Sequence, residues 1–211
     1  MRKILTMTFV CLLTGCGSPW ALFKNAQPGD VLYRESFSDP TSGWDRNTTE
    51  VGTQDYYDGT YRIIVNKLDY DLWGVTGRNY SDIRLEVNAT RLGGPVENRF
   101  GLICRYHNAL DFYFFVISSD GYFTIGKVSG GTLSLLGQPM MAYNGAILTG
   151  GTPNHLRFDC VGNTLTGYVN GQMVAITQDT AFTHGKVGLI AGSFASSGVD
   201  VVFDDFLVIK P

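Results

Sequence analysis

The sequence predicts an all-β protein whose antiparallel strands close into a sandwich or a barrel. Short runs rich in β-branched and aromatic residues recur along the chain, and turn sequences such as Asp120-Gly121 and Asn170-Gly171 separate them. No stretch keeps an amphipathic helical period for three turns. The predicted strands are residues 31–37, 59–65, 70–75, 82–90, 99–106, 112–118, 122–128, 132–136, 154–161, 164–170, 172–177, 186–193 and 199–209. Strands this short, joined by tight turns, form sandwiches or barrels.

The chain opens with the pattern of an export signal. Arg2 and Lys3 precede an apolar run at residues 4–13 that is too short to span a bilayer. Leu13-Thr14-Gly15-Cys16 then matches the bacterial lipobox, in which signal peptidase II cuts before a cysteine that carries diacylglycerol. An ordinary signal peptide with a chance cysteine is the alternative. The motif predicts lipid on Cys16 and a protein anchored outside the cytoplasm, in the bacterial cell envelope.

Three segments follow from this pattern. Residues 1–15 are the predicted signal peptide, and residues 16–29 are a tether with two prolines and no periodicity. Residues 30–211 form one β domain, which is long enough to bury a sizeable core.

The predicted strands differ in how many of their faces are apolar. Ile83 and Leu85 alternate with Arg84 and Glu86, so that strand has one face toward water. Residues 112–117 are apolar on both faces. Since only one face of a strand points into a two-layer core, we expect a loop or a ligand to cover the other.

Export would place Cys104 and Cys160 in an oxidising compartment. Each cysteine shares its strand face with apolar neighbours such as Leu102 and Phe158, so both are expected to point inward. We predict that the two form a disulfide, with two buried free thiols as the alternative.

The charge pattern argues against nucleic acid as a partner. The formal net charge is −3, and no basic run or stripe of Arg and Lys occurs. The sequence does not indicate an oligomeric state.

Five motifs form a recognisable set along the chain. They are the hairpin run of residues 154–171, Gly185-Lys-Val-Gly-Leu189, the closing strand at residues 203–208, the opening at residues 36–39 with Gly43-Trp44, and the early strand at residues 59–63. Together they resemble the concanavalin A-like and laminin G-like jelly rolls of bacterial lipoproteins, a group related to the 3-keto-disaccharide hydrolase domain family. The resemblance implies a two-sheet antiparallel jelly roll. It does not single out a function, because this fold serves lectins, adhesion modules, glycosidases and sensors alike.

The resemblance also implies a structural Ca²⁺ on the convex side of the jelly roll. Asp204 would be a ligand, with Glu35 or Asp39 and the carbonyl of Gly59 as companions. The alternative is that Asp204 only solvates an edge. No cofactor is expected to be essential.

Known catalytic motifs are missing from the sequence. Glycosidases of this superfold carry a Glu-x-Asp-x-(x)-Glu strand, whereas residues 86–90 hold the single carboxylate Glu86. There is no Gly-x-Ser-x-Gly elbow, and the three histidines lack zinc-ligand spacing. We therefore assign no catalytic residue. Should hydrolysis occur, Glu86, Asp111 and Asp120 are the first carboxylates to test.

Aromatic side chains near hydrogen-bond donors are the candidates for ligand binding. The proposed stacking platform for a sugar consists of Trp73, Tyr106, Tyr113 and Phe115. The proposed donors are Arg99, Arg105 and His107. The alternative is that this face is simply covered by a loop.

These patterns favour a lipid-anchored recognition module that binds a glycan or another envelope ligand without catalysis. Two alternatives remain: a glycoside hydrolase of the 3-keto-disaccharide type, and a structural or protein-interaction domain of the envelope.

Overall fold

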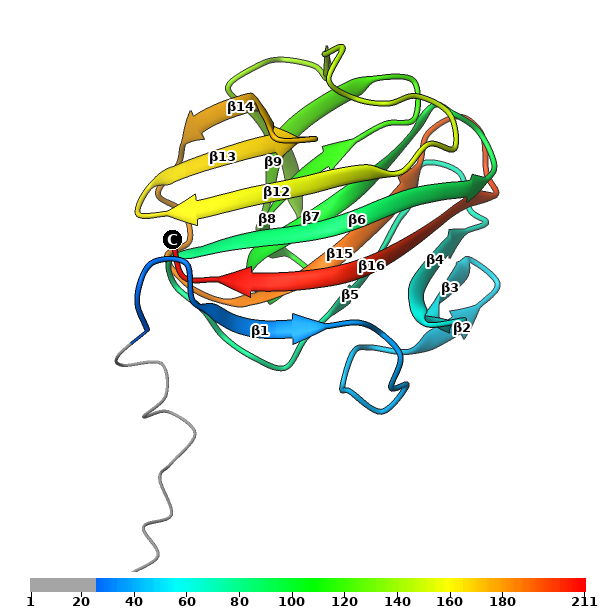
Figure 1. Ribbon diagram of the computed structural model, residues 1–211. Coiled ribbons are helices and arrows are strands. Elements are labelled where there is room, and N and C mark those ends of the chain that lie inside the picture. The colour runs from blue at the N-terminus through cyan, green and yellow to red at the C-terminus, as the bar shows by residue number, and fades with distance from the viewer. Residues whose placement is uncertain (1–25) are drawn as a thin grey trace, which may run out of the picture.

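The computed structural model describes residues 26–211, which form two antiparallel sheets stacked face to face (Figure 1). The nine-stranded first sheet has the order β14-β13-β12-β6-β16-β4-β3-β2, with β1 also paired to β16. The seven-stranded second sheet has the order β10-β9-β8-β7-β15-β5, with β11 paired to β9. In Figure 1, β12, β6 and β16 cross the front, and β8, β7 and β15 lie behind them.

The first sheet contains β1 (Val31–Glu35), β2 (Asn47–Thr49), β3 (Gly52–Tyr57), β4 (Thr60–Val65), β6 (Ile83–Gly93), β12 (Asn154–Val161), β13 (Thr164–Val169), β14 (Gln172–Gln178) and β16 (Val199–Ile209). The second contains β5 (Asp71–Val75), β7 (Asn98–Asn108), β8 (Asp111–Ile117), β9 (Tyr122–Ser129), β10 (Thr132–Leu136), β11 (Ala142–Tyr143) and β15 (Lys186–Ser193). No helix among these residues is long and apolar enough to cross a membrane.

The core lies between the sheets and follows the alternation of the strands. On β6, Ile83, Leu85 and Val87 are buried, while Arg84 and Glu86 project from the outer face. Phe115 of the second sheet meets Phe158 of the first across the core, with 5.8 Å between ring centroids. Every second residue thus supplies the apolar layer that holds the sheets together.

Cys104 on β7 and Cys160 on β12 form a disulfide across this core. Both residues are fully buried, as their apolar strand neighbours predict. The bond joins the two sheets, and the predicted pairing is confirmed.

Each strand expected from the sequence is present, and the structure adds β2, β3 and β11. β2 is fully exposed and polar, and β3 carries the polar run Thr53-Gln54-Asp55, so neither has the apolar alternation typical of a strand. They form by pairing outward from β4 at the edge of the first sheet. The predicted signal peptide, Cys16 and most of the tether lie outside the described residues.

The second sheet has an apolar outer face as well as an apolar inner one. Tyr113, Phe115 and Ile117 of β8 point into the core, while Phe112 and Phe114 lie on the outer face, where they are also buried. This outcome confirms that the strand is apolar on both sides.

Candidate functional site

A polar hollow of about 360 Å³ opens where the β2–β3 edge of the first sheet meets β5 of the second. We call it the edge pocket. It is lined by Asp45, Arg46, Asn47, Gln54, Tyr70, Asp71, Leu72 and Trp73. It therefore combines aromatic rings with amide, carboxylate and guanidinium groups.

The loop before β2 is fixed to both sheets and forms one wall of the edge pocket. Trp44 anchors it, since its buried ring packs 5.1 Å from that of Phe37 and 5.0 Å from that of Phe206. The carbonyl of Asp45 accepts a hydrogen bond from the Tyr61 hydroxyl, and its Oδ2 accepts one from the Val75 amide at 3.2 Å. The carboxylate of Asp45 is thereby held at the junction of the sheets.

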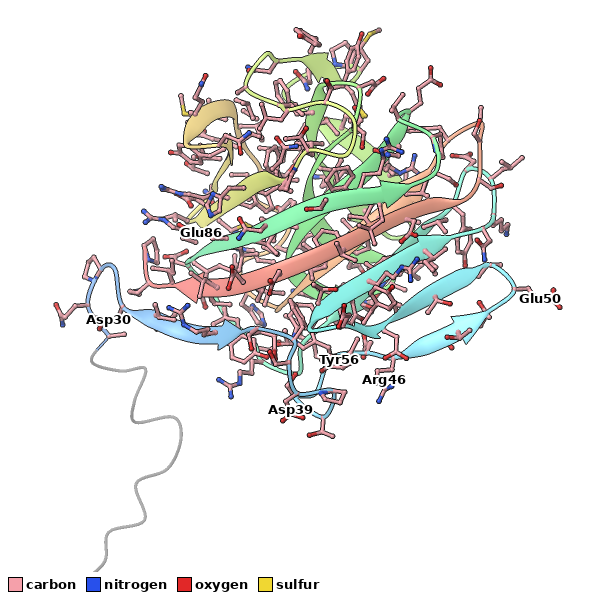
Figure 2. All side chains as sticks on the ribbon, turned by 45° about the vertical axis from the view of Figure 1, so that its right-hand side comes forward. Asp30, Asp39, Arg46, Glu50, Tyr56 and Glu86 are labelled. Carbon is pink, nitrogen blue, oxygen red and sulfur yellow. A yellow bond between two sulfur atoms is a disulfide. The ribbon has the colours of Figure 1, made fainter. Side chains whose placement is uncertain are left out.

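Arg46 continues this wall and is held by Asp55. Its Nε donates to Asp55 Oδ1 at 2.6 Å and its Nη2 to Oδ2 at 3.2 Å. The hydrogen bonds from Arg46 keep the pKa of the Asp55 carboxyl below its usual value. Figure 2 shows Arg46 beside Tyr56, whose ring centroid lies 5.6 Å from the guanidinium.

Asn47 and Gln54 place their amides side by side. They are direct partners across the β2–β3 ladder, so their side chains share one face of the hairpin. Gln54 Oε1 is buried and has no hydrogen-bond partner in the described structure. An acceptor left without a donor costs free energy, so a rotation of this amide toward a ligand hydroxyl would be favourable.

Trp73 of β5 forms the opposite wall. Its Nε1 donates to the Tyr106 hydroxyl at 3.4 Å, and its ring lies 5.5 Å from that of Phe112. Tyr70 precedes β5 and packs under Lys67, whose Nζ is 4.5 Å from the ring centroid. Trp73 is thus supported from behind by the second sheet.

Asp71 lies between the edge pocket and a second hollow on the outer face of the second sheet. Arg99 Nε donates to its Oδ1 at 2.5 Å and Nη2 to its Oδ2 at 3.1 Å. Burial raises the pKa of the Asp71 carboxyl, against the opposing effect of Arg99. The pair sits over Gly192, where a Cβ would fall 1.8 Å from Asp71 Oδ1.

The second hollow, which we call the apolar hollow, has a volume of about 200 Å³. It is lined by Asp71, Arg99, Phe112, Phe114, Val116, Thr124, Val128, Leu133, Leu135, Met141, Ile190 and Phe194. Its polar side chains are already engaged, because Arg99 binds Asp71 and the Thr124 hydroxyl donates to the Ile125 carbonyl at 3.2 Å.

Solved structures with this arrangement of strands share little sequence with the chain. The carbohydrate-binding module CBM66 from Bacillus subtilis is 19% identical with a TM-score of 0.64, covering 79% of this chain and 95% of that one. A galectin-like protein of unknown function from Bacillus subtilis is 12% identical with a TM-score of 0.63, covering 87% and 97%. A β-glucanase from Bacillus licheniformis is 13% identical with a TM-score of 0.61, covering 88% and 100%.

The fold is a concanavalin A-like jelly roll. The sequence itself matches no protein-family model and no curated protein. At these identities the structural likeness establishes the fold, and what the jelly roll binds has to be argued from its own residues.

Three of the ligand-binding residues predicted from the sequence lie together. Trp73 lines the edge pocket, Arg99 lines the apolar hollow, and Tyr106 contacts Trp73. Tyr113 and Phe115 do not join them, because both are fully buried between the sheets. Tyr113 is the direct partner of Cys104, which faces the core, so it faces the core as well.

Arg105 and His107 also lie elsewhere. Arg105 is a predicted donor for a ligand, but a bulge with φ of 52° turns its side chain inward, where it is 1% exposed. Its Nη1 donates to the Phe182 carbonyl at 2.8 Å, and burial lowers the pKa of the guanidinium. His107 is exposed beside His184, with its Nε2 2.7 Å from the His184 carbonyl.

The carboxylates predicted to bind calcium each accept a hydrogen bond within the protein. Among residues 26–211, no three His, Cys, Asp or Glu side chains gather as a metal-binding group. Glu35 accepts from the Phe37 amide, Asp39 from Thr41, and Asp204 from the Asp205 amide. Gly59 lies in the exposed turn before β4. Calcium binding stays a prediction from the sequence.

The three carboxylates considered for hydrolysis lie apart. Glu86 is on the outer face of the first sheet, 3.7 Å from His155, and Figure 2 shows it well away from Arg46. Asp111 and Asp120 lie at opposite ends of β8, where Asp111 accepts a hydrogen bond from the Gly130 amide and Asp120 accepts one from the Ser118 hydroxyl. None of them lines the edge pocket.

Asp45, Asn47 and Gln54 were not predicted from the sequence. They belong to a polar loop and to strands that form only by pairing, so no apolar pattern marks them. Phe112 and Phe114 were not predicted either, because the pairing of Tyr113 with Cys104 decides which face of β8 points outward.

Proposed function

We propose that this jelly roll binds a glycan in the edge pocket, and that lipid on Cys16 holds it at the bacterial cell envelope. The observation that carries the proposal is that the edge pocket is lined by both aromatic and amide side chains, namely Trp73, Tyr70, Asn47 and Gln54. A sugar ring offers C–H faces that pack on aromatic rings and hydroxyls that pair with amides. The pocket supplies both kinds of contact within one cavity.

The charged groups of the pocket favour binding over hydrolysis. Glycosidases generally need two carboxyl groups that act on the scissile bond. In the edge pocket both oxygens of Asp71 are held by Arg99, which leaves Asp45 as the carboxylate available to a ligand. We therefore propose recognition without catalysis, with Asp45 and the amides accepting hydrogen bonds from sugar hydroxyls.

Three further observations support glycan binding at the cell envelope. The structural neighbours include a carbohydrate-binding module and a β-glucanase. The lipobox at residues 13–16 supports an envelope anchor, and a disulfide in the core suits an oxidising compartment.

A glycan array followed by titration calorimetry of the purified protein tests the proposal. We expect Trp73→Ala and Gln54→Ala each to weaken binding at least tenfold. Thr53→Ala is the matched control, because it lies next to Gln54 on β3 but points to the opposite face of the strand. Thermal unfolding of each variant checks that the fold is intact.

The result that would overturn the proposal is the absence of binding to any glycan, or binding that neither pocket variant weakens. Release of reducing sugar from a bound glycan, or from 3-keto and ordinary disaccharides, would show hydrolysis and refute the non-catalytic assignment.

A further inference from the structure

The apolar hollow lies directly beside the edge pocket. Asp71 lines both cavities, and the ring of Trp73 in the edge pocket packs against Phe112 in the apolar hollow. The two cavities are therefore neighbours that share the Asp71 side of their linings.

The chemistry of the apolar hollow excludes a second sugar. Its polar side chains already pair within the protein, so hydroxyl groups entering it would lose their hydrogen bonds to water without replacement. Its remaining lining consists of aromatic, aliphatic and thioether groups. Such a surface gains free energy only by burying apolar atoms.

Two glycines allow the lining residues of the hollow to pack closely on the sheet. Gly126 lies under the ring of Phe114, where a Cβ would come within 2.2 Å of Cζ, and Gly192 leaves room for the Asp71–Arg99 pair. Leu133 on the edge strand β10 borders the hollow and is 52% exposed. An engineered apolar cavity of about 150 Å³ accepts benzene, so the volume of about 200 Å³ suits a short stretch of alkyl chain.

We propose that the apolar hollow binds the alkyl or acyl chain of a glycan-containing ligand whose sugar occupies the edge pocket. The ligand class is then a glycolipid-like amphiphile. This inference rests on the proposed glycan site, and it adds a second, separately testable contact.

The test of this inference compares methyl with n-octyl glycosides of glucose, galactose, mannose and fructose. Their affinities are measured below the micelle concentration by tryptophan fluorescence and calorimetry. We expect each octyl glycoside to bind at least tenfold tighter than its methyl partner, because several methylene groups leave water. Leu133→Asp should reduce this ratio to about one. Leu68→Asp is the matched control, since Leu68 is 54% exposed and lines neither cavity.

The outcomes separate this inference from the function on which it rests. Equal binding of methyl and octyl glycosides would overturn the inference and leave the glycan site intact. A chain effect that Leu133→Asp removes, with no effect of Gln54→Ala on any glycoside, would keep the apolar site and overturn the glycan site. No binding at all would overturn both. If Leu133→Asp changes the oligomeric state but octyl glycosides still bind tighter than methyl glycosides, the hollow is a contact between copies of the protein. That result would also overturn the inference.

Discussion

At the scale of single residues, Asp179 shows how a half-buried carboxylate beside the core is satisfied by hydrogen bonds. Its carboxylate accepts hydrogen bonds from Lys127 Nζ at 2.5 Å, the Tyr113 hydroxyl at 2.6 Å and the Ala181 amide at 2.8 Å. Burial by itself would raise the pKa of Asp179, but these donors outweigh it and lower the pKa. Burial and the bond to Asp179 raise the pKa of Tyr113 to about 12, so its hydroxyl stays a donor.

We expect Asp179→Asn to lower the free energy of unfolding at pH 7 by about 1–3 kcal/mol, because Lys127 loses its partner. A carboxyl whose pKa is lower in the folded state stabilises above its unfolded pKa of about 4, and this contribution disappears as pH falls through the folded value. The penalty should therefore shrink in acid. Denaturant titrations from neutral to acidic pH check this, with the exposed Asp58→Asn as the control. An equal penalty at every pH would contradict it.

The residue scale is also where prediction from sequence fails most. Alternation along a strand assigns faces correctly until a bulge intervenes, as the positive φ of Arg105 shows. For Tyr113 no bulge was involved, and only the pairing with Cys104 decides which face of β8 points inward. Because both faces of this strand are apolar, the strand's own sequence does not contain that choice.

At the scale of elements, β15 pairs as an ordinary strand, but its glycines leave room for side chains of the neighbouring strands. Leu189 and Ala191 fill the inner face, while Gly188 and Gly192 flank the buried Ile190 on the outer face. The space above Gly192 admits the Asp71–Arg99 pair, which borders the apolar hollow. The strand was predicted from the sequence. The reason for its glycines was not, because it depends on the side chains that β5 and β7 place above them.

We expect Gly192→Ala to destabilise the protein by about 1–3 kcal/mol through overpacking, since the new methyl group would collide with Asp71 Oδ1 and Arg99 Nε. Displacement of the pair should also weaken ligand binding. The matched control is Gly77→Ala, at an exposed position with open space around the added Cβ. Thermal and denaturant unfolding measure both variants. The same stability in both would show that the pair moves aside without cost.

At the scale of the whole molecule, the strand inventory and the two-sheet closure follow from the sequence because both depend on apolar periodicity. The edge pocket does not follow, since β2 and β3 are polar and gain their structure from β4. Asn47 and Gln54 are brought to Trp73 only by the meeting of two sheet edges. Function here depends on the part of the fold that local pattern describes least.

The disulfide is a covalent link between the two sheets, and its contribution to stability can be measured. It links β7 to β12 across a sequence separation of 56 residues and so restricts the unfolded chain strongly. In the chain-entropy model a loop of this length contributes about 4 kcal/mol. We expect the double variant Cys104→Ala, Cys160→Ala to lose up to that amount in denaturant unfolding, while the apolar core keeps the fold. Reducing agent should destabilise the wild-type protein by a similar amount and leave the double variant unchanged. If reduction does not shift the wild-type transition, apolar burial alone holds the sheets together.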